Sequence, residues 1–70
     1  MERYKDLRDL RYKNGDLSQA EMAKKIGIAA SNYSLIESGK RNGARRTWLK
    51  IQEVFGLSDG EVWRMQNRNQ

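Results

Sequence analysis

Residues 18–39 read SQAEMAKKIGIAASNYSLIESG, and this stretch decides the fold. Ser18 can cap a helix, and Glu21 stands where it completes a Ser-x-x-Glu capping box. Gly27 can adopt the left-handed backbone conformation that ends a helix. Between these signals, apolar residues recur at helical spacing and form one face: Met22, Ala23 and Ile26. The stretch therefore begins with a short amphipathic helix that stops at a glycine.

A second helix is expected directly after Gly27. Its apolar face consists of Ile28, Tyr33 and Ile36, and Gly39 closes it. Two helices joined by so short a turn cannot lie antiparallel, so they cross at a steep angle and one of them projects outward. A projecting helix of this kind can enter the major groove of DNA.

These residues resemble the helix-turn-helix of the Cro and lambda-repressor-like family, the XRE-type regulators. The resemblance is carried by Gln19, Ala23, Gly27, the apolar trio and the run Glu37-Ser38-Gly39-Lys40. The flanks also fit the family: Leu10-Arg11 before the motif, and Thr47-Trp48-Leu49, Ile51 and Phe55-Gly56-Leu57-Ser58 after it. The resemblance covers nearly the whole chain and implies an all-α fold, a compact five-helix lambda-repressor-like DNA-binding domain.

The composition agrees with a single small domain. Seventy residues suffice for one modest core, and we expect residues 1–66 to form it, with 67–70 as a polar C-terminal tail. The chain contains neither cysteine nor histidine, which excludes disulfides, the usual zinc sites and histidine acid–base chemistry. It also contains no apolar run near the ~20 residues of a membrane span. We expect a cytoplasmic protein that has no enzymatic activity. It should bind no cofactor, metal or small-molecule ligand, and it should not associate with a membrane.

The remaining helices follow from the same signals. The first is expected over Glu2–Lys13, ended by Asn14-Gly15-Asp16. The fourth is expected over Arg45–Phe55, and a short fifth helix opens with a second capping box. The expected environments of single side chains are as follows: Trp48, Ile51, Val54 and Phe55 buried, Tyr33 in the core with its hydroxyl in water, Trp63 partly exposed at a dimer interface, and the end from Gln66 frayed.

The net charge of +5 is concentrated in one segment. Residues 40–50 contain five basic residues and no acid, whereas basic and acidic residues nearly balance elsewhere. A basic segment beside a projecting helix is where DNA phosphates would lie, and their neutralisation releases counterions. The candidates for phosphate contact are Gln19, Lys40, Arg41, Asn42, Arg45 and Arg46.

The resemblance assigns further roles to single residues. It places the base-reading candidates on the projecting helix, at Ala30, Ser31, Asn32, Ser34 and Leu35, although Leu35 could instead extend the core. None of these is the arginine, lysine or glutamine that makes a long bidentate base contact. The resemblance also implies a structural pair between Arg11 and Glu37. Ala29 falls at the N-cap of the same helix, where alanine is unfavourable by ~1 kcal/mol.

The expected function is that of a sequence-specific transcriptional regulator. The resemblance implies a Cro-type repressor of bacterial or phage origin that binds double-stranded DNA as a homodimer, at a pseudo-palindromic operator. One alternative is an antitoxin-like protein whose main partner is a toxin, although the short tail offers little surface for one. The other is a helical protein-interaction domain without DNA binding, which the basic segment disfavours.

Overall fold

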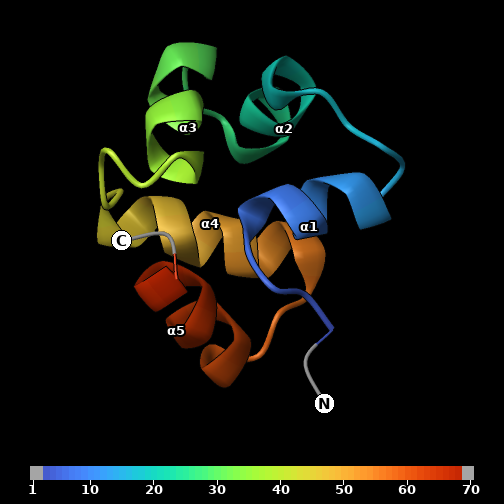
Figure 1. Cartoon of the computed structure of the whole chain (residues 1–70), viewed down its shortest axis with the longest axis vertical. Coiled ribbons are helices and arrows are strands. Elements are labelled where there is room, and N and C mark those ends of the chain that lie inside the picture. The colour runs from blue at the N-terminus through green and yellow to red at the C-terminus, as the bar shows by residue number, and fades with distance from the viewer. Residues whose placement is uncertain (1–2, 69–70) are drawn as a thin grey trace.

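The computed structural model describes residues 3–68, and these form five helices and no strand. The helices are α1 (Leu7–Lys13), α2 (Gln19–Ile26), α3 (Ala30–Glu37), α4 (Arg45–Phe55) and α5 (Asp59–Arg68) (Figure 1). This confirms the predicted all-α class and the order of the elements.

The start of α1 differs from the prediction. A helix from Glu2 was expected, but α1 begins at Leu7, and Glu2 lies outside the described residues. Asp6 is the N-cap, and its carboxylate accepts a hydrogen bond of 2.9 Å from the backbone N–H of Asp9. The Asp9 carboxylate in turn accepts one of 3.0 Å from the N–H of Lys5. This capping, which the Asp-x-x-Asp spacing could have revealed, holds the preceding residues out of the helix.

Both predicted capping boxes are present. At the start of α2, the Glu21 N–H donates to Ser18 Oγ at 3.1 Å and the Ser18 N–H to Glu21 Oε1 at 2.9 Å. Ser58 and Glu61 make the same two bonds before α5. That helix, α5, is longer than expected: it continues to Arg68 and so includes two residues of the predicted tail. The rest of the tail, Asn69 and Gln70, lies outside the described residues.

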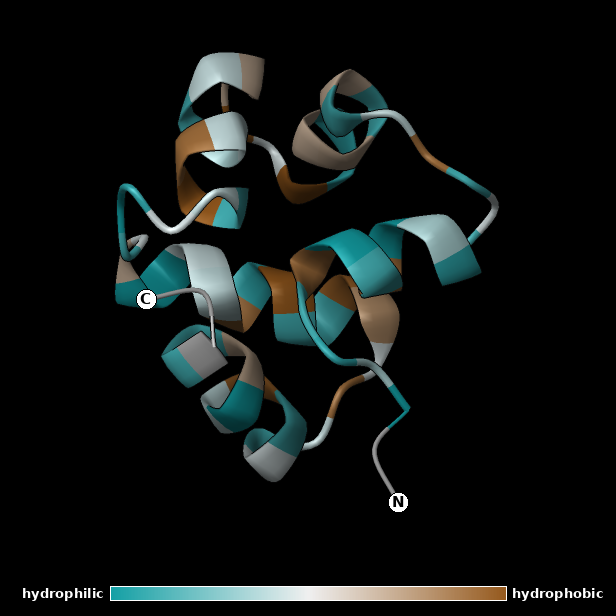
Figure 2. Ribbon diagram, in the orientation of Figure 1, coloured by the Kyte–Doolittle hydropathy of each residue, from teal (hydrophilic) through white to brown (hydrophobic). Residues whose placement is uncertain are grey.

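The helices surround one core, with α4 between the α2–α3 pair and α5 (Figure 1). The most hydrophobic segments are on the sides where the helices face one another (Figure 2). The core residues are Leu7, Leu10, Met22, Ala23, Ile26, Tyr33, Ile36, Trp48, Ile51, Leu57, Val62 and Met65. One prediction was wrong: Val54 is 38% exposed, because it lies at the edge of the buried face of α4. Phe55 is half-buried against the core.

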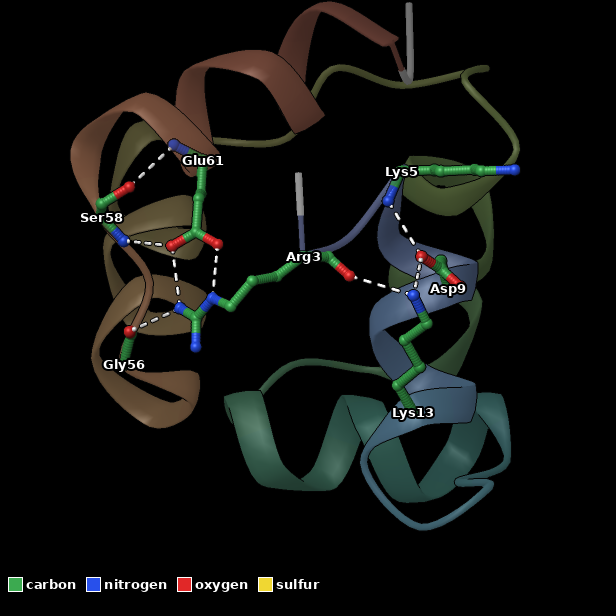
Figure 3. A network of polar contacts seen from close by, with 7 residues as sticks. All are labelled: Arg3, Lys5, Asp9, Lys13, Gly56, Ser58 and Glu61. Carbon is green, nitrogen blue, oxygen red and sulfur yellow. Dashed lines mark hydrogen bonds and ion pairs between the residues drawn. The ribbon is translucent and has the colours of Figure 1, made fainter. Parts of the chain in front are cut away.

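The segment before α1 is tied to the turn between α4 and α5 (Figure 3). The Arg3 guanidinium donates to both carboxylate oxygens of Glu61, at 2.7 and 2.8 Å, and to the carbonyl of Gly56 at 3.2 Å. Lys13 Nζ donates to the Arg3 carbonyl at 3.0 Å. We call Arg3 and these three partners the N-terminal strap. The bonds from Arg3, together with the Ser58 N–H, lower the pKa of Glu61 to about 2.

Candidate nucleic-acid interface

The turn between α2 and α3 sets the direction of the projecting helix. Gly27 has a φ of 87°, and its N–H donates to the Ala23 carbonyl at 2.8 Å. The same carbonyl accepts the Ile28 N–H at 3.0 Å. Nothing lies within 4 Å of a Cβ placed on Gly27, so the backbone angle and not the space requires glycine. Ile28 then packs against the core, which fixes how α3 leaves the turn.

The exposed side of α3 carries the residues predicted to read bases. Ala30 and Ser31 are exposed, and Asn32, Ser34 and Leu35 are half-buried. Leu35 does not belong to the core cluster, so the alternative that it extends the core is not supported. The opposite side of α3 is buried through Tyr33 and Ile36. The five candidates therefore occupy one helix, on its sides away from the core.

The end of α3 is fixed by a carboxylate that three helices share. Arg11 of α1 donates from Nε and Nη2 to Glu37, at 3.0 and 2.9 Å. Gln19 of α2 donates from Nε2 to Glu37 Oε1 at 3.2 Å. The Tyr33 hydroxyl donates to Glu37 Oε2. We call these four residues the Glu37 cluster. The arginine–glutamate contact agrees with the pair that the family resemblance implied, and it orients α3 relative to α1.

Two details of this cluster were not foreseen. The Tyr33 hydroxyl was expected in water, but the side chain is fully buried and the hydroxyl bonds to Glu37, which was a wrong prediction. Gln19, a predicted phosphate contact, uses one amide hydrogen within the protein and keeps a second donor. The positions of Gln19 and Glu37 are 18 residues apart, so no local sequence signal reveals this bond.

The cluster determines the protonation of its members. Burial raises the pKa of Glu37, but the hydrogen bonds from Arg11, Tyr33 and Gln19 outweigh it and hold that pKa below its ordinary value. Burial and the bond to Glu37 raise the pKa of Tyr33, and the bond to Glu37 raises the pKa of Arg11. The carboxylate therefore stays ionised and the phenol and guanidinium stay protonated, which preserves the bonds at neutral pH.

The basic segment follows α3 directly and is exposed. Its side chains that could contact phosphate are all on the surface: Lys40, Arg41, Asn42, Arg45 and Arg46. The backbone N–H groups of Lys40 and Arg41 both donate to the Leu35 carbonyl, at 3.0 and 3.1 Å, so the segment starts against α3. Asn42 accepts a 2.8 Å bond from Trp48 Nε1 at its carbonyl, which leaves its side-chain amide outside this contact.

A groove of about 380 Å³ lies between the α2–α3 turn and the start of α4. Ala44 is the N-cap of α4 and makes no side-chain cap bond, and the first turn of the helix holds no acid. The N–H groups of such a helix start favour an anion. The charged and polar side chains that line the groove are Asn32, Arg41, Arg46 and Thr47. The groove is thus open, basic and adjacent to α3.

No group of three or more acidic residues among residues 3–68 could hold a metal ion. No helix in this part of the chain is long and apolar enough to cross a membrane.

Comparison with known proteins agrees with this geometry. A family model described as helix-turn-helix matches residues 7–62. An uncharacterized HTH-type transcriptional regulator of Archaeoglobus fulgidus is 34% identical over 65 residues, covering 81% of this chain and 91% of that protein. Control protein C.MunI of a Mycoplasma species is 37% identical over 57 residues, covering 81% of this chain and 77% of that protein. No solved structure matches the chain significantly. The chain belongs to the XRE-type helix-turn-helix family of DNA-binding transcriptional regulators.

Proposed function

We propose that this protein is a Cro-type repressor that binds a pseudo-palindromic operator as a homodimer. Each protomer places α3 in a major groove, with half-sites about one helical turn apart. Occupation of a promoter then excludes polymerase. The observation that supports this most strongly is the position of the basic segment, which carries five positive charges and no acid directly after α3.

The phosphate contacts lie on both sides of α3 in this proposal. On one side, Gln19 at the start of α2 uses its second amide hydrogen for a phosphate oxygen, while Glu37 holds its side chain in place. On the other side, the uncapped start of α4 and Arg46 face the groove, with Lys40, Asn42 and Arg45 exposed nearby. Such contacts supply affinity for any DNA sequence.

The base contacts fall on the exposed part of α3. Ser31 and Ser34 can bond to several base edges, Leu35 can pack against thymine methyl groups, and Ala30 allows close approach. Because these side chains are short, the shape and deformability of the site carry a large share of specificity.

The homodimer in this proposal forms through α4 and α5. Trp63 is 64% exposed and Leu49 is 51% exposed, and both line a groove of about 440 Å³ between these helices. Helix α5 lies on the other side of α4 from α3 (Figure 1). Two copies joined there leave both α3 helices free to contact DNA.

A salt titration of DNA affinity tests the proposal. For the unaltered protein, log K should fall steeply with log salt concentration, and Arg45→Ala should reduce that slope by about one unit. Arg64→Ala is the matched control, because it removes the same charge from α5, and its slope should equal that of the unaltered protein. A flat slope, or no binding to duplex DNA, would contradict DNA-binding repression.

A further inference from the structure

Apart from Asn32, the reading face of α3 has no side chain that could make two hydrogen bonds to one base, and asparagine pairs in this way with adenine. Ala30, Ser31 and Ser34 are too short, and Leu35 has no polar atom. Discrimination of guanine in the major groove commonly depends on a bidentate arginine or lysine contact to O6 and N7. If this protein reads a guanine in that way, the donor must come from outside the five candidates.

Arg41 reaches α3 from the basic segment at two points. Its backbone N–H donates to the carbonyl of Leu35 at 3.1 Å, near the end of the helix. Its guanidinium Nη1 donates to Asn32 Oδ1 at 2.7 Å, in the first turn of the helix. The side chain therefore lies along the flank of α3. Within residues 3–68, the structure shows no comparable side-chain bond for Arg45 or Arg46, which are also exposed.

The bond between Arg41 and Asn32 changes what the pair can present to DNA. Asn32 has one carbonyl oxygen, and Arg41 already contacts it. The other N–H groups of Arg41 are all donors, whereas Asn32 keeps its amide hydrogens and one lone pair on Oδ1. Guanine presents two adjacent acceptors in the major groove, whereas adenine presents an acceptor beside a donor. The guanidinium of Arg41, which offers donors alone, therefore matches guanine better than adenine.

We propose that Arg41 reads a guanine at a fixed position of each half-site, and that Asn32 is the positioning residue that holds its guanidinium. This inference rests on the proposed function, because it requires α3 to lie in a major groove. It gives Arg41 a different role from the phosphate contact expected from sequence. Phosphate binding on this side of α3 then falls to Arg46 and the start of α4, which line the same groove, and to the exposed side chains of Lys40, Asn42 and Arg45.

Selection of bound duplexes from a random pool is the first step of the test. The unaltered protein should select a site with a guanine whose replacement lowers affinity about 10-fold or more. Arg41→Ala should remove the preference at that position and leave preferences elsewhere unchanged. Asn32→Ala should weaken the preference at the same position. Arg45→Ala, the matched control, should lower affinity while keeping the whole profile of base preferences.

Replacement of the selected guanine by 7-deazaguanine is the second step, because it removes the N7 acceptor alone. Affinity of the unaltered protein should fall, whereas affinity of Arg41→Ala should not change. Circular dichroism melting establishes that each variant is folded. If Arg41→Ala lost affinity for all duplexes equally and kept the same profile of base preferences as Arg45→Ala, base reading by Arg41 would be overturned. DNA binding by the protein would not be affected by that result. An unchanged profile in Asn32→Ala would overturn the positioning role. If the unaltered protein bound no duplex, the proposed function itself would fail.

Discussion

At the scale of single residues, Glu37 shows how one buried charge can fix the orientation of α3, the helix proposed to contact bases. Its carboxylate accepts bonds from α1, from α2 and from its own helix. A buried ion is unfavourable when it is unpaired, so these donors stabilise the carboxylate, together with an ion pair of 3.7 Å to Arg8. Glu37, the last residue of α3, therefore also holds the side chain of Gln19 at the start of α2. A change at Glu37 should thus affect both α3 and the proposed phosphate contact of Gln19.

We expect the loss of one partner of this ion pair to be worse than the loss of both charges. Arg11→Met should lower the free energy of unfolding by about 3–5 kcal/mol, because it removes both hydrogen bonds of Arg11 to the buried Glu37 carboxylate and leaves only the longer contact of 3.7 Å with the exposed Arg8. Adding Glu37→Gln should restore part of that loss, since the neutral amide still accepts the Tyr33 hydroxyl. Urea unfolding of the two single variants and the double variant measures the coupling. Losses that simply add would contradict a paired buried charge.

Glu61 should contribute to the dependence of stability on pH. Its pKa is about 2 in the folded protein, below the value of about 4.3 in an unfolded chain. A lowered carboxyl pKa stabilises the fold above the unfolded value, and this contribution disappears as pH falls from about 4.3 towards 2. The difference in unfolding free energy between the unaltered protein and Glu61→Gln should therefore shrink over that range.

Arg3→Ala provides the comparison for this measurement, because Arg3 is the main cause of the lowered pKa. The variant should lose part of the same pH dependence while it keeps the capping bonds between Ser58 and Glu61. Chemical unfolding at several pH values between 2 and 6 measures both variants. A difference that stays constant over this range would show that Glu61 does not titrate as described.

At the scale of helices and turns, local signals in the sequence predicted most of the fold. Capping boxes, the turn at Gly27 and the apolar periodicity act within a few residues, so they can be recognised without a structure. The start of α1 was placed too early because Asp6 was not recognised as a cap, although its signal was also local. The contacts of Asn32 with Arg41 and of Gln19 with Glu37 could not be predicted, since they depend on how separate segments meet.

Gly43 provides a prediction at this scale, with Gly27 as its control. Both have positive φ, 83° and 87°. A Cβ on Gly43 would lie 3.0 Å from Trp48 Nε1 and 3.2 Å from Ile36 Cδ1, whereas one on Gly27 would meet open space. Gly27→Ala should cost about 1 kcal/mol for the strained backbone. Gly43→Ala should cost more, as measured by thermal or urea unfolding, because the core must also move. Equal losses would mean that the packing around Gly43 adjusts freely.

At the scale of the whole molecule, the two proposed contact surfaces meet at the start of α4, because Arg45 lines the same groove as Trp63 and Leu49. The DNA surface includes α3 and the basic segment, and the dimer surface includes Trp63 and Leu49. The sequence indicated the first surface through its charge. It indicated the second only through Trp63, which was expected to be partly exposed, whereas Leu49 was given no such role.

The dimer surface can be tested independently of DNA. Trp63→Ala should weaken self-association at least about 10-fold, because it removes a large exposed aromatic from the proposed contact. Its melting temperature at low protein concentration should change little, since the side chain is mostly outside the core. Sedimentation equilibrium measures the dissociation constant. Tyr12→Ala removes an exposed aromatic from α1 and should leave association unchanged. The same constant for both variants would exclude Trp63 from the interface.

The N-terminal strap has a consequence for the rates of folding and unfolding. The bond between Arg3 and Glu61 joins positions 58 residues apart and so closes a loop that includes nearly the whole chain. Closing a long loop loses more chain entropy than forming the turns of a helix, so contacts within the helices and turns form first. The strap is then among the last contacts made and the first broken. Its bonds should slow the opening of the molecule while leaving the speed at which it folds almost unaffected.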